Sequence, residues 1–271
     1  MIIRHDVNPA HYLAEAKQFA AIVAVDSHLE EVLIGYDNID QLLKPNLLTS
    51  VQTAPEFTLC TDGMGCLIQP DWILTAAHVA EALTESHKIS ICNSAYEIQQ
   101  IFLHPDYTPS NYAYAEDVSQ VHHDLALIRL AQPVKAIAPL PLYTQQDELN
   151  QIATLVGSGD YGTGLIGPDQ ADGKLRKATN RIEDVNAEWL VFKFDAPPEC
   201  TELEGVCGPG DSGGPGLLKV NGKWAIAGVS SGQHSPQSTS FDQGGEGRYG
   251  VWEYYTRVSS HLSWIESVLS Q

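Results

Sequence analysis

Three residues in separate stretches of the chain have side chains that could act together as a nucleophile, its base and an orienting acid. Ser212 lies in Cys-Gly-Pro-Gly-Asp-Ser-Gly-Gly-Pro-Gly, residues 207–216, whose glycines and prolines do not suit a helix interior or a central strand. Such a loop can hold one hydroxyl outward while backbone N–H groups converge beside it, as a nucleophile with an oxyanion hole requires. The alternative interpretation of this stretch is an ordinary tight turn.

A serine hydroxyl is a weak nucleophile, so it needs a base, and the base needs a group that orients it. The candidate base His78 follows the apolar segment Trp-Ile-Leu-Thr-Ala-Ala, and the candidate acid Asp124 precedes Leu-Ala-Leu-Ile-Arg-Leu; both segments are typical of buried strands. Taken singly, a histidine after an apolar segment is more often structural, and an aspartate before a strand is usually a turn residue. Together with Ser212, the two residues indicate acyl-transfer chemistry.

These three stretches resemble the signatures of the chymotrypsin/trypsin-like serine proteases. The matching motifs are Thr-Ala-Ala-His at residues 75–78, Asp-Leu-Ala-Leu at 124–127 and Gly-Asp-Ser-Gly-Gly-Pro at 210–215. The order His, Asp, Ser also matches, whereas other folds that carry this triad use other orders. The resemblance is specific from about residue 64 onward. It implies a serine endopeptidase that works through an acyl-enzyme, with His78, Asp124 and Ser212 as its catalytic residues.

The resemblance also implies an all-β fold of two antiparallel six-stranded barrels and a C-terminal α-helix. We expect residues 1–135 to form the barrel with His78 and Asp124, including an insertion at about 26–60, and 136–271 to form the barrel with Ser212. Periodicity alone predicts many short strands and a terminal helix over 258–269 whose inner residues are Leu262, Trp264, Ile265 and Val268. Asn8 and Pro9 predict the start of a short helix that continues to residue 19.

Further roles follow from the resemblance alone. The N–H groups of Gly210 and Ser212 would form the oxyanion hole, and Ser230 would support Asp124. The alternative is that Ser230 is an ordinary strand serine. The expected substrate-binding residues are Val206, Cys207, Ser230, Gly232 and Glu253.

The sequence departs from the family pattern around this pocket. Ser231 stands where the family commonly has tryptophan, which predicts a more open wall. The loop before Ser212 has one extra residue, so the pocket floor would be Gly205 or Val206, neither of them acidic. Glu253 stands where a glycine usually lines the wall, which predicts a preference for Arg or Lys before the scissile bond. The alternative is that Glu253 faces solvent or fills the pocket.

In the family, a freed Ile or Val α-amine pairs with the aspartate next to the catalytic serine and so shapes the oxyanion hole. The matching pair here would be the amine of Ile2 and Asp211. A retained Met1 would place the amine one residue too far out, by about 3.3–3.6 Å of chain. We therefore expect a chain that starts with Met1 to be inactive and one that starts with Ile2 to be active.

Composition narrows the range of partners and compartments. The formal net charge of −19 argues against nucleic-acid binding, and the sequence contains no apolar segment that could span a membrane. We expect a monomer that acts on protein or peptide substrates without a cofactor. We also expect no metal site, because the adjacent His122 and His123 would point to opposite faces of a strand.

The five cysteines are few for an animal relative and favour a bacterial exported type, secreted or periplasmic. Residues 1–6 do not form a signal peptide, so either the protein is cytosolic or Met1 has replaced a native leader, and the resemblance to exported proteases favours replacement. Cys60 could bond to Cys66 and Cys200 to Cys207 as disulfides, whereas Cys92 is expected to be a buried free thiol. Two other functions remain open at this point. One is a catalytically silent homologue that acts as a binding protein, and the other is an esterase that uses the same triad.

Overall fold

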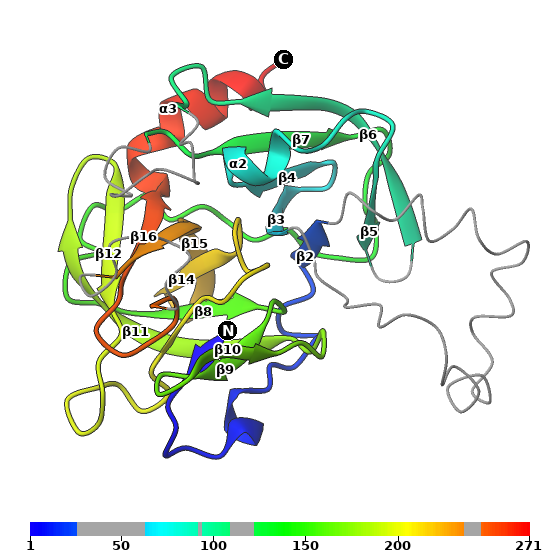
Figure 1. Cartoon of the computed structure of the whole chain (residues 1–271). Helices are drawn as coiled ribbons and strands as arrows, with labels where there is room; N and C mark the ends of the chain where they lie inside the picture. The colour runs from blue at the N-terminus through cyan, green and yellow to red at the C-terminus, as the bar shows by residue number, and fades with distance from the viewer. Residues whose placement is uncertain (26–62, 92–93, 109–121, 236–244) are drawn as a thin grey trace, which may run out of the picture.

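The computed structural model describes residues 1–25, 63–91, 94–108, 122–235 and 245–271, which form two β-barrels and a terminal helix (Figure 1). The predicted insertion at 26–60 lies outside the described residues, as do Cys60 and Cys92. The fold class predicted from the sequence is confirmed.

The first barrel is a six-stranded sheet in which β5 lies beside β2 and so closes the curve. Its strands, in spatial order, are β2 (Ile22–Val25), β3 (Gly63–Gln69), β4 (Trp72–Thr75), β7 (Ala126–Leu130), β6 (Ser94–Leu103) and β5 (Lys88–Ile91). All of β4 and most of β7 are buried, because their apolar side chains fill the barrel interior and pack in one apolar cluster with residues of the second barrel.

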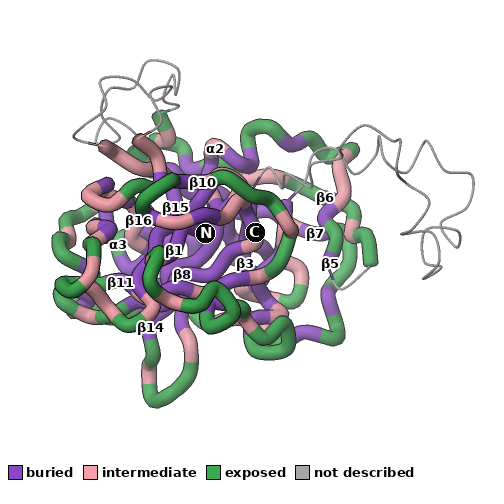
Figure 2. Tube along the Cα trace, turned by 60° about the horizontal axis from the view of Figure 1, so that its bottom comes forward, coloured by how far each residue is buried: buried purple, intermediate pink, exposed green. Residues whose placement is uncertain are grey.

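The second barrel is a closed six-stranded sheet. Its strands, in spatial order, are β11 (Arg176–Val185), β12 (Trp189–Lys193), β16 (Trp252–Arg257), β15 (Lys223–His234), β14 (Pro215–Val220) and β8 (Ile152–Gly157). Figure 2 shows the buried parts of the trace gathered in the interior and the exposed parts at the periphery, as expected for sheets closed around packed cores.

Each end of the chain packs on the barrel that is distant in sequence. At the N-terminus, β1 (Ile2–Ile3) pairs antiparallel with β13 (Gly205–Val206) and parallel with β9 (Tyr161–Thr163), which in turn pairs with β10 (Gly167–Gln170). The domain boundary at 135/136 stays a prediction, but the first residues lie against the second barrel.

The predicted helix after Asn8 is wrong beyond its first turn. Asn8 Oδ1 accepts from the N–H of Ala10, and a 3-10 helix, η1 (Pro9–Tyr12), follows. Leu13 is already extended and forms a bridge with Arg176, and Ala14 N–H donates to Leu175 O at 2.9 Å. Pairing with the second barrel therefore replaces further helical hydrogen bonds.

The C-terminal helix α3 (Val258–Leu269) has the predicted bounds. Ile265 and Val268 are buried as predicted, whereas Leu262 and Trp264 are half-buried. Val258 and the predicted inner residues pack into the same apolar cluster as the strands of the first barrel, so the helix joins the two halves. Among the described residues, no helix has the length and hydropathy needed to span a bilayer.

The cysteine pairings suggested by the sequence are wrong where the structure describes them. Cys66, Cys200 and Cys207 are all free thiols. This excludes the Cys200–Cys207 bridge and leaves Cys66 without a disulfide. Burial raises the pKa of the Cys207 thiol well above its usual value, and the negative charge of Glu253 adds to the effect, so this thiol is a poor nucleophile.

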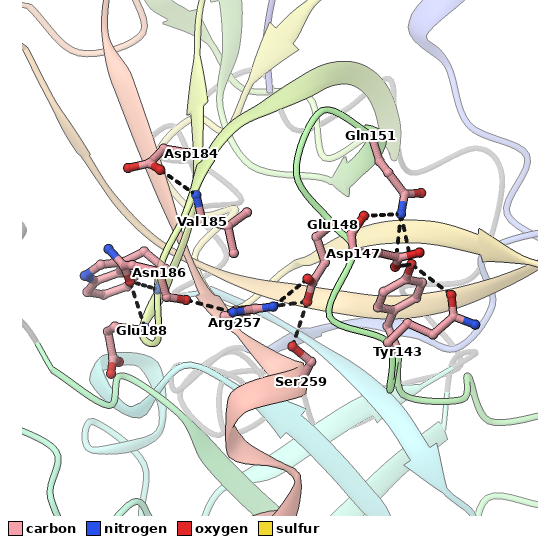
Figure 3. A network of polar contacts seen from close by, with 12 residues as sticks. Tyr143, Asp147, Glu148, Gln151, Asp184, Val185, Asn186, Glu188, Arg257 and Ser259 are labelled. Carbon is pink, nitrogen blue, oxygen red and sulfur yellow. Dashed lines mark hydrogen bonds and ion pairs between the residues drawn. The ribbon is translucent and has the colours of Figure 1, made fainter.

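A buried ion pair fixes the start of α3 (Figure 3). Arg257 donates to both carboxylate oxygens of Glu148, at 3.0 and 2.6 Å, and Ser259 Oγ donates to Glu148 Oε1 at 2.6 Å. Arg257 also donates to Asn186 O at 3.0 Å, which ties the helix to the turn before β12. The Glu148 side chain is fully buried, yet its pKa lies below the usual value, because Arg257 and Ser259 outweigh the cost of burial.

Glu148→Gln is expected to lower the free energy of unfolding by about 3–5 kcal/mol, because it leaves the charge of Arg257 without its partner. The pKa of Glu148 is lowered in the folded state. Its ionised carboxylate therefore stabilises the fold at pH values above its unfolded-state pKa of about 4.3, and this stabilisation is lost as pH falls through its folded-state pKa. Urea unfolding at pH 7 and pH 3 measures both effects. Glu266→Gln, on the exposed face of α3, is the matched control; equal losses in the two variants would contradict the prediction.

Candidate active site

Strand pairing in the first barrel brings His78 and Asp124 together. His78 lies on the short helix α2 (Ala77–Ala80), directly after β4, and Asp124 lies shortly before β7. Because β4 and β7 are antiparallel, with Thr75 opposite Ala126, the end of one strand meets the start of the other. His78 Nδ1 lies 2.7 Å from Asp124 Oδ2, and His78 backbone N–H donates to Oδ1 at 2.9 Å.

Asp124 is fully buried where the two barrels meet. From the second barrel, Ser231 Oγ donates to Asp124 Oδ2 at 2.5 Å and Thr256 Oγ1 donates to the Asp124 carbonyl at 2.9 Å. Burial alone would raise the pKa of Asp124, but attraction to His78 and the donated hydrogen bonds hold it below the usual value. The Asp124 carboxylate is therefore an anion that accepts three hydrogen bonds, two from His78 and one from Ser231.

The serine that supports Asp124 is Ser231, so the prediction that Ser230 does so is wrong. The pairing of β15 with β16 shifts register between Ser230 and Gly232, which changes the direction in which each side chain points. Ser230 instead bonds through its backbone to Gly213 and Gly214 and lines the pocket. The residue after the supporting serine is consequently Gly232.

His78 is placed to act as a base. Burial opposes a charge on its ring, but attraction to Asp124 and the hydrogen bond with it raise the pKa of His78 above its ordinary value. Such an imidazole accepts a proton more readily than a free one. Its partner Asp124 stabilises the imidazolium that results.

Two glycines in the loop of Ser212 have positive φ angles. Gly210 and Gly213 have φ values of 83° and 80°, which favour glycine. A Cβ at Gly213 would lie 2.2 Å from Met64 O, and Met64 N–H donates to Ser212 O at 2.6 Å, so β3 presses closely on the loop. Ser212 and His78 line the same cavity.

That cavity has a volume of about 200 Å³ and is the candidate substrate pocket. Four of the predicted pocket residues line it, namely Cys207, Ser230, Gly232 and Glu253. The prediction for Val206 is wrong: this side chain is fully buried, its strand pairs with Ile2, and it packs with Phe194 and Val251 in a separate cluster.

Other lining residues were missed by the sequence reasoning. They are Gly208, Pro209, Ser231, Gln233 and Glu246. Gln233 Nε2 donates to Cys207 O at 2.8 Å and its Oε1 accepts from Gly247 N–H at 3.0 Å, so Gln233 links two segments of the wall. Gly208 and Pro209 belong to the loop already singled out, whereas no motif marks Gln233 or Glu246.

Glu253 lies at the pocket with its side chain fully buried. Both of its carboxylate oxygens lie 3.0 Å from Cys207 N, whose N–H donates to them. Burial raises the pKa of Glu253 to about 8 despite these hydrogen bonds. The expectation that Glu253 faces solvent is thereby excluded, and its carboxyl group is largely protonated at neutral pH.

The α-amine that contacts Asp211 is that of Met1. The amine lies 2.5 Å from Asp211 Oδ2 with both groups fully buried, and it also donates to Asp160 O. Asp211 further accepts from Gly159 N–H at 2.7 Å and Gly208 N–H at 2.9 Å. The expectation that a retained Met1 places the amine too far from Asp211 is therefore wrong. In this chain Ile2 pairs through its backbone in β1, and its pairing with Asp211 in a chain without Met1 stays a prediction.

Known proteins resemble this chain over most of its length. A sequence model described as Trypsin matches residues 49–265. The vitamin K-dependent protein C of Mus musculus is 29% identical over 243 residues, which cover 76% of this chain and 46% of that protein. The chymotrypsin-like elastase family member 1 of Felis catus is 27% identical, with 76% of this chain and 78% of that protein covered. The chain thus spans about half the length of protein C. Because the family model matches well over half of its residues, the chain belongs to the trypsin family.

Proposed function

We propose that this chain is a serine endopeptidase that hydrolyses peptide bonds through Ser212, His78 and Asp124. The observation that carries the proposal is the 2.7 Å contact between His78 Nδ1 and Asp124 Oδ2, beside a pocket that Ser212 and His78 both line. Membership of the trypsin family and the homologues named as elastases support the same activity.

In the proposed reaction, Ser212 Oγ attacks the carbonyl carbon of the substrate while its proton passes to His78 Nε2. The oxyanion that forms accepts hydrogen bonds from the N–H groups of Gly210 and Ser212. His78 then gives the proton to the leaving amine as the C–N bond breaks, and water hydrolyses the acyl-enzyme by the same route. Asp124 keeps the proton of His78 on Nδ1 and stabilises the imidazolium.

We further propose that the pocket accepts Arg or Lys before the scissile bond. Glu253 and Glu246 both line it, and burial raises the pKa of each. A bound guanidinium or ammonium would supply the opposite charge and so favour the ionised form of Glu253. An apolar side chain would meet a neutral carboxyl group instead, so the pocket can admit both classes with a preference set by pH.

The ratio of kcat/KM for Arg over Phe substrates is expected to rise as pH increases through about 8, where Glu253 ionises. Glu253→Gln should lower this ratio by about 10–100-fold and abolish its pH dependence, because a charge-assisted hydrogen bond contributes about 1.5–3 kcal/mol. Taking the ratio cancels the titration of His78, which both substrates share. Glu97→Gln, at an exposed carboxylate, is the control, and an unchanged ratio in Glu253→Gln would rule out this role.

The two other functions predict different results. A silent homologue would leave Ser212 unlabelled by a fluorophosphonate probe. An esterase would be labelled but would cleave small acyl esters and no member of a peptide library. We therefore propose peptide-library digestion as the deciding experiment for the endopeptidase.

We also propose that the partners are protein or peptide chains and that the enzyme acts as a monomer outside the cytoplasm. The net charge of −19 supports the exclusion of nucleic acid as a partner. Family membership supports export. Size-exclusion chromatography with light scattering tests the oligomeric state.

A further inference from the structure

Three histidines form a cluster behind the catalytic aspartate that the proposed reaction does not use. His104 follows β6, His123 directly precedes Asp124, and His261 lies on α3. Figure 1 shows the end of β6 beside α3, and the His104 ring lies 4.8 Å from that of Trp264 on this helix. One ligand atom from each ring lies within 4.8 Å of the other two. His104 and His261 are buried, and the His123 side chain is 35% exposed, so the cluster has a route to solvent.

The hydrogen bonds already orient two of these rings. His261 Nδ1 lies 2.8 Å from Arg257 O, an acceptor only, so Nδ1 carries the proton and Nε2 acts as an acceptor. That Nε2 lies 3.1 Å from His123 Nδ1. A backbone carbonyl that fixes the tautomer of a ligating histidine is the usual outer partner of a metal site.

A carboxylate completes the set. Glu188 Oε2 lies 3.4 Å from His123 Nδ1, and Glu188 Oε1 lies 3.9 Å from His261 Nε2. Oε1 also accepts from the backbone N–H of His123 at 2.6 Å, which holds the carboxylate against the cluster. Three imidazoles and one carboxylate are ligands that Zn²⁺ accepts in a closed tetrahedral site.

We propose that His104, His123, His261 and Glu188 bind a divalent transition-metal ion of the zinc class. Zn–N bonds of about 2.0–2.1 Å place tetrahedral ligand atoms about 3.3 Å apart. The His123–His261 distance of 3.1 Å is close to this value, and the widest pair, at 4.8 Å or less, must approach by about 1.5 Å at most. The His104 and His123 rings stack with their centroids 4.5 Å apart and 10° between their planes, so one of them must rotate before both can point a lone pair at the same ion. Of the two side chains, His123 is the more exposed, and we expect it to rotate. The residue has an uncommon φ of 54°, as residues at functional sites often do.

The His104 ring is uncharged and so does not repel a cation. Burial and the neighbouring His123 and His261 lower the pKa of His104 to about 4, so this ring is neutral at physiological pH. The ion takes the place of the proton between His123 and His261, and that proton moves to His123 Nε2. His104 must make one adjustment: Asp106 N–H donates to its Nδ1 at 3.3 Å, so ligation through Nε2 would give up this long hydrogen bond.

The absence of a metal site was expected because His122 and His123 are adjacent in sequence. The structure instead groups His123 with two distant histidines, which no local pattern could indicate. A bound ion would join the end of β6, the segment before β7 and α3, and would fix the backbone next to Asp124.

The test uses the whole chain after removal of metals with a chelator. With Zn²⁺ at about one hundred times its Kd, Tm should rise by about 5–10 °C. Co²⁺ should give the intense visible bands of tetrahedral coordination. His261→Gln and His104→Asn should each abolish both signals, and Glu188→Gln provides a third variant if either fails to fold.

Two controls separate this site from other histidines. His11→Ala removes an exposed imidazole, and His78→Ala removes the proposed catalytic one; both variants should keep the full Tm rise and the Co²⁺ spectrum. The proposal is overturned if millimolar Zn²⁺ leaves the Tm of the unmodified chain unchanged. It is also overturned if the signals survive in His261→Gln and His104→Asn, or vanish in His78→Ala.

Discussion

Ser212→Ala is expected to lower kcat/KM by about 10⁵–10⁶-fold while the free energy of unfolding stays within about 0.5 kcal/mol of its original value. The large kinetic effect follows because, of the described serines that line the pocket, Ser212 alone lies in the glycine-rich loop, whereas Ser230 and Ser231 lie on β15. The small stability effect follows because the carbonyl of Ser212, which accepts from Met64 N–H at 2.6 Å, is unchanged by the substitution.

The decisive comparison is with the double variant. Residues that act as one unit are not additive, so His78→Ala in the Ser212→Ala background should cost little more. Circular dichroism is the folding control for each variant. A fluorophosphonate probe should label the unmodified chain alone. A further loss of about a hundredfold or more in the double variant would mean that another group acts as the nucleophile.

The sequence predicted the strands next to His78 and Asp124 and the loop of Ser212, because the residues of these segments are locally distinctive. Apolar segments such as those of β4 and β7 have the length and composition of buried strands, and glycine-rich loops mark where a chain must turn. The terminal helix was predicted with its observed bounds for the same reason. Its apolar residues recur at helical spacing, and β16 ends directly before it.

The missed elements have no such local signal. The strands β1, β9, β10 and β13 have two to four residues each. β1 pairs with β9 and β13, which are far from it in the chain, and β10 pairs with the nearby β9. Two residues cannot show a periodicity. The short helix predicted after Asn8 failed through the same cause, because Leu13 and Ala14 bond to the distant β11 and the residue before it.

The serine assignment shows how one residue of register changes a site. Ser230 and Ser231 are adjacent and identical in type, so a motif alone cannot tell which one faces Asp124. The shift in the pairing of β15 with β16 decides it, and this shift depends on contacts across the barrel. Another long-range pairing, that of β13 with β1, places Val206 in a cluster away from the pocket.

Asp211→Asn is expected to lower kcat/KM by about 10³-fold or more and the free energy of unfolding by about 3–5 kcal/mol. The carboxylate of Asp211 accepts from three donors, and one of them is the buried ammonium of Met1 at 2.5 Å. An asparagine would turn one oxygen into a donor and leave the ammonium without a counter-charge. The backbone of residues 208–212, which the same carboxylate holds, would then lose the arrangement that positions Ser212.

A second change breaks the same pair from its other side. In the printed chain, which starts with Met1, one glycine added before Met1 converts the buried ammonium into an amide and moves the charge one residue away. This extended chain should lose activity to a similar degree, because the carboxylate of Asp211 would then be buried without a cation. Asp160→Asn is the matched control, since Asp160 contacts the amine through its backbone oxygen, which the substitution keeps.

The measurements must separate a damaged site from an unfolded chain. We would compare Tm, kcat/KM and the rate of fluorophosphonate labelling for Asp211→Asn, the extended chain and Asp160→Asn. Slow labelling in the first two at temperatures below their Tm would show that the ion pair shapes the loop around Ser212. Full labelling rates in both variants would show that the loop holds its conformation without the pair. In that case the backbone hydrogen bond that the asparagine loses, from either Gly159 or Gly208, could not be what positions the nucleophile either.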